Sequence, residues 1–300
     1  MSIIINQILI MGILIIVGYF LYKSNMIDAE TSMKISNFLL KIIIPVTIIE
    51  SFMVPFNVEL LKQIGLVSVL TLVITFLMAY ITKFIFKEDE RIERYACIFT
   101  NKGFIGIPLM RAIFGIEAVS IVTPIIVISN IIAWTYGVDL LSGNKKKTNI
   151  RRILTNPSVI GFIVGLIFFF VPFNFPYPIT QSITLMASIN TPLAMIVIGT
   201  YLAEENIALV LTNKKAYKVS FIRLILLPLI VIGLVGYLPI DPLVKNVFII
   251  SMAVPTAANT AMFAQLAGSN YSYGAQLVCL TTLLSGLTLP MIMLIIEYLF

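Results

Sequence analysis

Long apolar runs, separated by short polar connections, constrain this chain more than any other feature of its sequence. A helix needs about 20 mostly apolar residues to cross the hydrocarbon core of a bilayer. Only 11% of the 300 residues are charged and the mean hydropathy is +1.04, whereas about 25% of a soluble domain is charged. We therefore predict an all-α polytopic membrane protein with ten transmembrane helices, at about 3–22, 35–56, 62–86, 94–114, 117–141, 156–172, 179–203, 214–237, 245–266 and 272–298.

The basic residues predict how these helices are oriented, because cytoplasmic loops of membrane proteins carry an excess of Lys and Arg. Counted from the N-terminus, the odd-numbered loops contain fourteen basic residues and the even-numbered loops three. We expect a multi-pass protein of the cell (plasma or inner) membrane, with both termini outside and the basic central loop, 143–155, in the cytoplasm. This distribution accounts for the net charge of +6 without a nucleic-acid partner.

The composition also excludes several functions. The chain has no His, which removes imidazole chemistry and most zinc sites. Its two cysteines, Cys97 and Cys279, lie in apolar segments and are expected to be reduced packing residues. Because the sequence also lacks a central pair of carboxylates and a nucleophile motif, we predict no enzyme activity, no metal and no cofactor.

The central loop separates two sets of five apolar segments, so we divide the chain into 1–142, the loop 143–155, and 156–300. Sliding one half along the other by 147 residues superimposes three pairs of Gly or Pro: Gly18 and Gly165, Pro45 and Pro192, and Pro108 and Pro255. Five helices are an odd number, so the two halves are expected to have opposite orientations. This inverted repeat is the plan of many secondary transporters.

Two of the predicted helices contain breaks near the middle of the membrane. The stretch NKGFIGIP, 101–108, lies between Arg94 and Arg111, which a helix would separate by about 26 Å. Pro108 interrupts a helix, and Gly103 and Gly106 permit non-helical backbone. The ninth segment has a matching break at Pro255, followed by Asn259 and Thr260. Two broken helices at corresponding positions predict a transporter binding site, because freed backbone groups at membrane depth must face protein or a wet cavity.

Lys102 lies within the first break, where a buried charge costs about 2.5–3.5 kcal/mol on insertion scales. It therefore needs a partner, a neutral form or water. The sequence leaves open whether Lys102 extends to the membrane surface or is paired with Asn side chains, helix carbonyls, an anionic substrate or Glu50. Asn130, Thr47 and Asn190 are further polar residues that line the same cavity or form helix–helix hydrogen bonds. Arg223 lies near the cytoplasmic end of its segment and is expected to extend to the membrane surface.

Three stretches resemble the auxin efflux carrier family of membrane transporters: TNKGFIGIPL, NFLLKIIIPVTIIESF and MAVPTAANTAMFAQLAG. The resemblance runs over nearly the whole chain. It implies that broken helices four and nine cross in a mobile transport part, while helices one, two, six and seven form a scaffold that can dimerise. Movement of one part against the other would alternate access like an elevator. Plant members export the auxin anion and bacterial members are associated with carboxylates such as malate. Lys102 departs from the neutral residue that is usual in the family.

Together these observations predict a secondary active transporter of a small organic anion, a carboxylate such as auxin-like or malate-like acids. The expected substrate-binding residues are Asn101, Lys102, Gly103, Gly106, Pro108, Asn130, Pro255, Thr256, Asn259 and Thr260, with scaffold-side contacts from Pro45, Thr47, Asn190 and Thr191. The expected partners are the lipid bilayer, the anion and a second copy of the chain. A sodium-coupled symporter of the bile-acid type and a membrane ligand sensor that does not transport are the alternatives.

Overall fold

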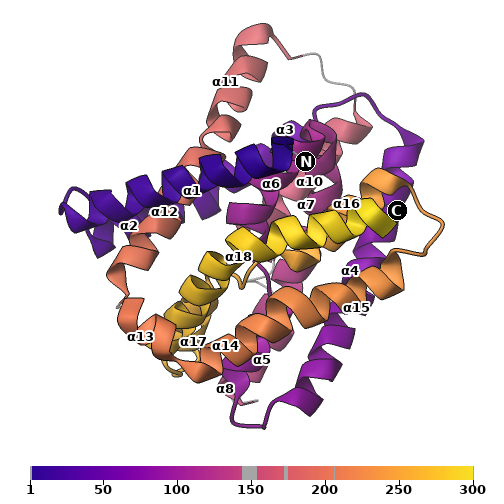
Figure 1. Ribbon diagram of the computed structural model, residues 1–300. Helices are drawn as coiled ribbons and strands as arrows, with labels where there is room; N and C mark the ends of the chain where they lie inside the picture. The colour runs from indigo at the N-terminus through magenta and orange to yellow at the C-terminus, as the bar shows by residue number, and fades with distance from the viewer. Residues whose placement is uncertain (1, 144–153, 172–174, 206, 300) are drawn as a thin grey trace.

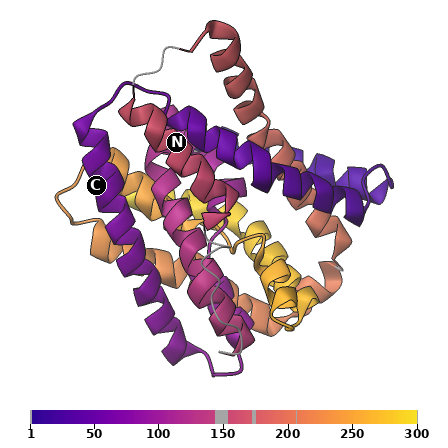
Figure 2. The ribbon, with the colours of Figure 1, turned by 180° about the vertical axis from the view of Figure 1, so that it is seen from behind.

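The computed structural model describes residues 2–143, 154–171, 175–205 and 207–299, and these ranges are helical with one isolated β-bridge (Figures 1 and 2). The all-α prediction is therefore confirmed. Most of the predicted basic loop, 144–153, lies outside the described residues. Six helical stretches in the described ranges are long and apolar enough to cross a membrane, and shorter apolar helices cover Leu9–Lys23, Pro157–Phe170 and Pro242–Ala253.

Most helices overlap the predicted apolar segments, whereas α13 lies between two of them and α2 begins before its predicted segment. The first half contains α1 (Ser2–Lys23), α2 (Ala29–Phe38), η1 (Leu39–Ile43), α3 (Ile44–Ser51), α4 (Val58–Ile85), α5 (Arg91–Ile98), η2 (Lys102–Gly106), α6 (Ile107–Phe114), α7 (Ile116–Ile132), η3 (Ala133–Gly137) and α8 (Val138–Ser142). The second half contains α10 (Pro157–Phe170), α11 (Tyr177–Ser188), α12 (Asn190–Glu204), α13 (Ile207–Thr212), α14 (Lys214–Phe221), η4 (Ile222–Leu226), α15 (Leu227–Val235), α16 (Pro242–Ala253), α17 (Thr260–Leu266) and α18 (Tyr271–Leu299).

Short π-helical turns, labelled η, precede three prolines that lie inside apolar segments. Pro45, Pro108 and Pro228 each occupy the first turn of the α-helix that follows such a turn. Proline has no backbone N–H and cannot donate the hydrogen bond of a continuing helix. A π turn, whose backbone hydrogen bonds span five residues instead of four, accommodates this interruption locally. The chain therefore continues through these prolines, and its direction changes only locally.

Glycines let two pairs of helices approach closely. A Cβ added to Gly18 of α1 would lie 2.1 Å from the carbonyl oxygen of Ile196 in α12. A Cβ on Gly165 of α10 would lie 2.8 Å from the ring of Phe52, directly after α3, and one on Gly161 would lie 2.9 Å from Pro45. Small residues at helix interfaces are typical of membrane proteins because backbones can then come into contact.

The helices pack as two groups. The α12 group consists of α1, α2, α3, α10, α11 and α12, and the α7 group consists of α4 to α7 and α14 to α18. In Figure 1, α1 crosses α12, while α16 packs against α15 and α18 in the other part of the bundle. The two groups meet where α12 contacts η2 and where α3 and α10 contact α7.

Candidate functional site

The two predicted breaks lie side by side and hydrogen-bond to each other. Thr100 and Thr256 form the isolated antiparallel bridge. The backbone N–H of Asn101 donates to the carbonyl of Pro255 at 2.8 Å, and that of Ala257 donates to the carbonyl of Phe99 at 3.0 Å. These two stretches, 99–101 and 255–257, are called the crossing below. Each break satisfies the backbone groups that the other would otherwise leave unpaired in the membrane interior.

The pairing at the crossing differs from the sequence alignment of the two halves. That alignment superimposes Pro108 on Pro255, whereas the structure pairs Thr100 with Thr256, which lies 156 residues later. Pro108 is in the first turn of α6, beyond the break, so it does not set the position of the break as predicted. The offset of 147 residues therefore does not describe the crossing. An alignment of glycines and prolines cannot detect this, because backbone pairing depends on how the helices dock.

Asn101 begins the helix that leaves the crossing. Its side-chain oxygen accepts a hydrogen bond from the backbone N–H of Phe104 at 3.2 Å, and its carbonyl accepts from Ile105 and Gly106. This is the capping role that Asn commonly has at a helix start. The Nδ2 group of Asn101 is buried and has no hydrogen-bond partner in the described part of the chain.

A cavity of about 480 Å³ adjoins the crossing. Of the predicted site residues, five line it: Asn101, Lys102, Gly103, Asn130 and Asn259. The others are not in its lining: Gly106, Pro108, Pro255, Thr256, Thr260, Pro45, Thr47, Asn190 and Thr191.

Three of the threonines outside the lining have hydroxyls that are already engaged within the protein. The hydroxyl of Thr256 donates to the carbonyl of Ala96 at 2.9 Å, that of Thr260 to Ala257 at 2.7 Å, and that of Thr47 to Ile43 at 2.9 Å. These bonds hold the local backbone, so they account for the three hydroxyls without a ligand.

Several polar groups in the cavity wall have no hydrogen-bond partner among the residues that the structure describes. Besides Asn101 Nδ2, these are the hydroxyls of Tyr95 and Ser129, both buried. Lys102 is only 4% exposed, and its ammonium makes no hydrogen bond or ion pair with the described residues. Buried polar groups are nearly always hydrogen-bonded. All four groups can donate, so the cavity wall is suited to a molecule that accepts hydrogen bonds.

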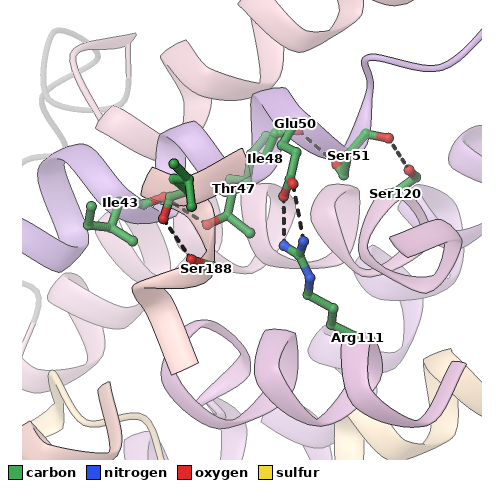
Figure 3. Close-up of polar contacts among 9 residues, drawn as sticks. Ile43, Thr47, Ile48, Glu50, Ser51, Arg111, Ser120 and Ser188 are labelled. Carbon is green, nitrogen blue, oxygen red and sulfur yellow. Dashed lines mark hydrogen bonds and ion pairs between the residues drawn. The ribbon is translucent and has the colours of Figure 1, made fainter. Parts of the chain in front are cut away.

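Glu50 is not the partner of Lys102, which removes one of the alternatives that the sequence left open. Its carboxylate binds Arg111 through both oxygens, at 2.6 Å to Nη1 and 3.1 Å to Nη2 (Figure 3). Arg111 lies in α6, and the planar guanidinium fits a carboxylate in this two-pronged arrangement. Sequence reasoning did not pair Glu50 with Arg111.

Arg223 contradicts its predicted position at the membrane surface. Its side chain is 0% exposed and lies in η4, against the ends of α5 and α16. The guanidinium donates to the carbonyls of Cys97 at 2.9 Å and Val254 at 3.2 and 3.3 Å, and also to that of Met252. Helix C-termini carry partial negative charge and free carbonyls, which explains why an arginine stays buried there. The available signal was a lone Arg within an apolar run.

Sequence reasoning also missed part of the cavity wall. Ser129 adjoins the predicted Asn130, and Tyr95 precedes the break by two turns, so both were within reach of a helical argument. Tyr201, Glu204 and Glu205 come from the end of α12 in the other half of the chain and could be placed only by the tertiary structure. Burial raises the pKa of the Glu205 carboxyl, and the neighbouring Glu204 adds to this rise.

The long apolar helices and the cavity beside two paired breaks are those of a multi-pass membrane transporter. A family model described as membrane transport protein matches residues 3–293. The chain belongs to this family, the auxin efflux carrier family.

Two relatives agree with this assignment. An uncharacterized transporter of Methanocaldococcus jannaschii is 25% identical over 95% of this chain and 96% of its own. The protein PIN-LIKES 7 of Arabidopsis thaliana is 30% identical over 44% of this chain and 36% of its own.

Proposed function

We propose that this protein is a secondary active transporter of a small organic anion, which binds in the cavity beside the crossing. The observation that carries the proposal is the buried lysine Lys102, which lines this cavity and has no acidic partner among the described residues. A carboxylate would accept hydrogen bonds from Lys102, Asn101 and Ser129 and would balance the charge. Burying a charge without such compensation is costly.

The packing of the helices supports an elevator mechanism within this proposal. The cavity lies between the α12 group and the α7 group, since Tyr201 comes from α12 and Asn130 from α7. Displacement of the α7 group against the α12 group would carry the crossing and its ligand across the membrane. A homodimer through the α12 group, termini outside and a cytoplasmic central loop are parts of the same proposal.

One helix contact favours an inverted repeat. A Cβ on Gly199 would lie 2.9 Å from the Cα of Gly18, and Gly165 contacts Phe52. Adding 147 to Gly18 and Phe52 gives Gly165 and Gly199, so the contact of α1 with α12 corresponds to that of α10 with α3. Related helix pairs in the two halves therefore pack at equivalent residues.

The test is a thermal-stability screen of the purified full-length protein with malate, malonate, indole-3-acetate and their neutral amides. A ligand that binds only the folded state raises the melting temperature by mass action. We expect at least one carboxylate to raise it by several degrees in wild type and not in Lys102→Met, because the mutant lacks the charge. Lys62→Met, which removes an exposed lysine, is the matched control.

Equal responses of wild type and Lys102→Met, or stabilisation by the neutral amides alone, would contradict an anion site. Binding without any uptake by proteoliposomes would favour the ligand sensor over the transporter.

A further inference from the structure

We propose that Arg223 is a fixed internal cation of the crossing, occupying the carbonyl cluster at which a sodium-coupled transporter would bind a mobile cation. The cluster consists of the carbonyl oxygens of Cys97, Met252 and Val254. All three receive hydrogen bonds from the one guanidinium. They come from the two helices that end at the crossing, α5 and α16.

The charges at this cluster balance. A helix C-terminus carries roughly −0.5 of an elementary charge, so two such ends offset about one positive charge. Arg223 is fully buried, and no carboxylate of the described residues forms an ion pair with it. The two helix ends are therefore the counter-charge of the guanidinium.

Backbone carbonyls at the ends of broken helices are also the ligands that transporters offer to Na⁺. A guanidinium is permanently charged and holds five donors in a fixed plane. With Arg223 in place, the three carbonyls are used and the negative helix ends are neutralised. Na⁺ then gains neither free ligands nor an unbalanced charge at this position.

This inference concerns the coupling ion and goes beyond the proposed substrate. It disfavours the sodium-coupled bile-acid type of transporter, which needs cation ligands of its own. Neither part of the test below measures transport or anion binding, so its result is independent of the proposed function.

The first part of the test uses the wild-type chain in detergent and compares melting temperatures in NaCl, KCl and choline chloride at equal ionic strength. We expect the three values to agree within about one degree, because a cation that finds no site does not stabilise the folded state. A saturable rise of several degrees that only Na⁺ produces would overturn the proposal.

The second part uses Arg223→Met, with Lys214→Gln as a control that removes an exposed basic residue two turns earlier in the same segment. We expect Arg223→Met to melt several degrees lower, since three buried carbonyls lose their donor. We expect Na⁺, and not choline, to restore part of this loss, because the carbonyls are then free to bind it.

A merely structural role for Arg223 would lower the melting temperature without creating a response to Na⁺, and that result would overturn the cation-replacing role. A melting temperature equal to wild type would overturn it as well. If Arg223→Met does not fold, Arg223→Gln takes its place: its amide carries no charge and donates to fewer carbonyls, so the same gain of Na⁺ sensitivity is expected.

Discussion

Two buried basic residues near the crossing, Arg223 and Lys102, differ in the partners that surround them. Arg223 is fully paired with backbone carbonyls, whereas Lys102 faces a cavity without a partner among the described residues. The first arrangement is complete within the protein, and the second lacks an acceptor. This difference is the basis for the two proposals, that Arg223 balances the charge of the helix ends and that Lys102 binds the ligand.

Mutation can distinguish hydroxyl groups near the crossing that have a hydrogen-bond partner within the protein from those that have none among the described residues. Ser129→Ala removes a buried hydroxyl without a described partner, so we expect the free energy of unfolding to stay within about 0.5 kcal/mol of wild type. Thr256→Val removes the hydroxyl that donates to Ala96 and is expected to cost about 1 kcal/mol. Chemical denaturation in detergent measures both. Equal losses in the two variants would show that Ser129 has a structural partner.

At the scale of elements, broken and tightly packed helices decide where the site forms. The extended stretches of the crossing pair with each other, and π turns carry the chain through Pro45, Pro108 and Pro228. The α12 group is in turn held by close contacts at Gly18 and Gly165. The paired stretches and the π turns keep backbone groups hydrogen-bonded, while a cavity remains within the apolar bundle.

The contact of α1 with α12 gives a prediction with a control in the same helix. In Gly18→Ala the new Cβ would overlap the backbone of Ile196, and we expect a loss of about 1–3 kcal/mol because backbone has to shift. Gly12→Ala meets nothing within 4 Å and is expected to be neutral or slightly stabilising. Melting temperatures of the two variants check this. If both behave alike, α1 and α12 do not cross at Gly18.

At the scale of the whole molecule, polar contacts between α3 and the helices α6 and α7 join the two helix groups (Figure 3). Glu50 of α3 binds Arg111 of α6, and the hydroxyl of Ser120 in α7 donates to the carbonyl of Ser51. Since α3 belongs to the α12 group and α6 and α7 to the α7 group, sliding of the groups would have to break these contacts.

A cross-link at this place tests the elevator proposal. In a background with Cys97→Ser and Cys279→Ser, we expect oxidation of the double variant Ser51→Cys/Ser120→Cys to stop transport and reduction to restore it. A disulfide at these positions would fix the two groups together. Transport of a carboxylate into proteoliposomes is the measurement, and each single-cysteine variant is the control. Full transport by the cross-linked protein would exclude relative movement of the two groups at this contact.

The sequence by itself determined the membrane class, the helical segments and the two breaks, because these follow from local composition. Apolar runs of bilayer length specify helices, and Pro, Gly and a lysine within such runs mark the breaks. The motif around Asn101 and Lys102 was also sufficient to indicate the family, and both residues line the cavity.

Only the tertiary structure decided which groups meet. The pairing of Thr100 with Thr256, the carbonyls around Arg223 and the ion pair of Glu50 with Arg111 join residues that are distant in sequence. Such contacts depend on how the helices dock, which backbone periodicity does not specify. A charged residue within an apolar segment therefore indicates that a partner is needed, and the packing of the helices determines which partner it has.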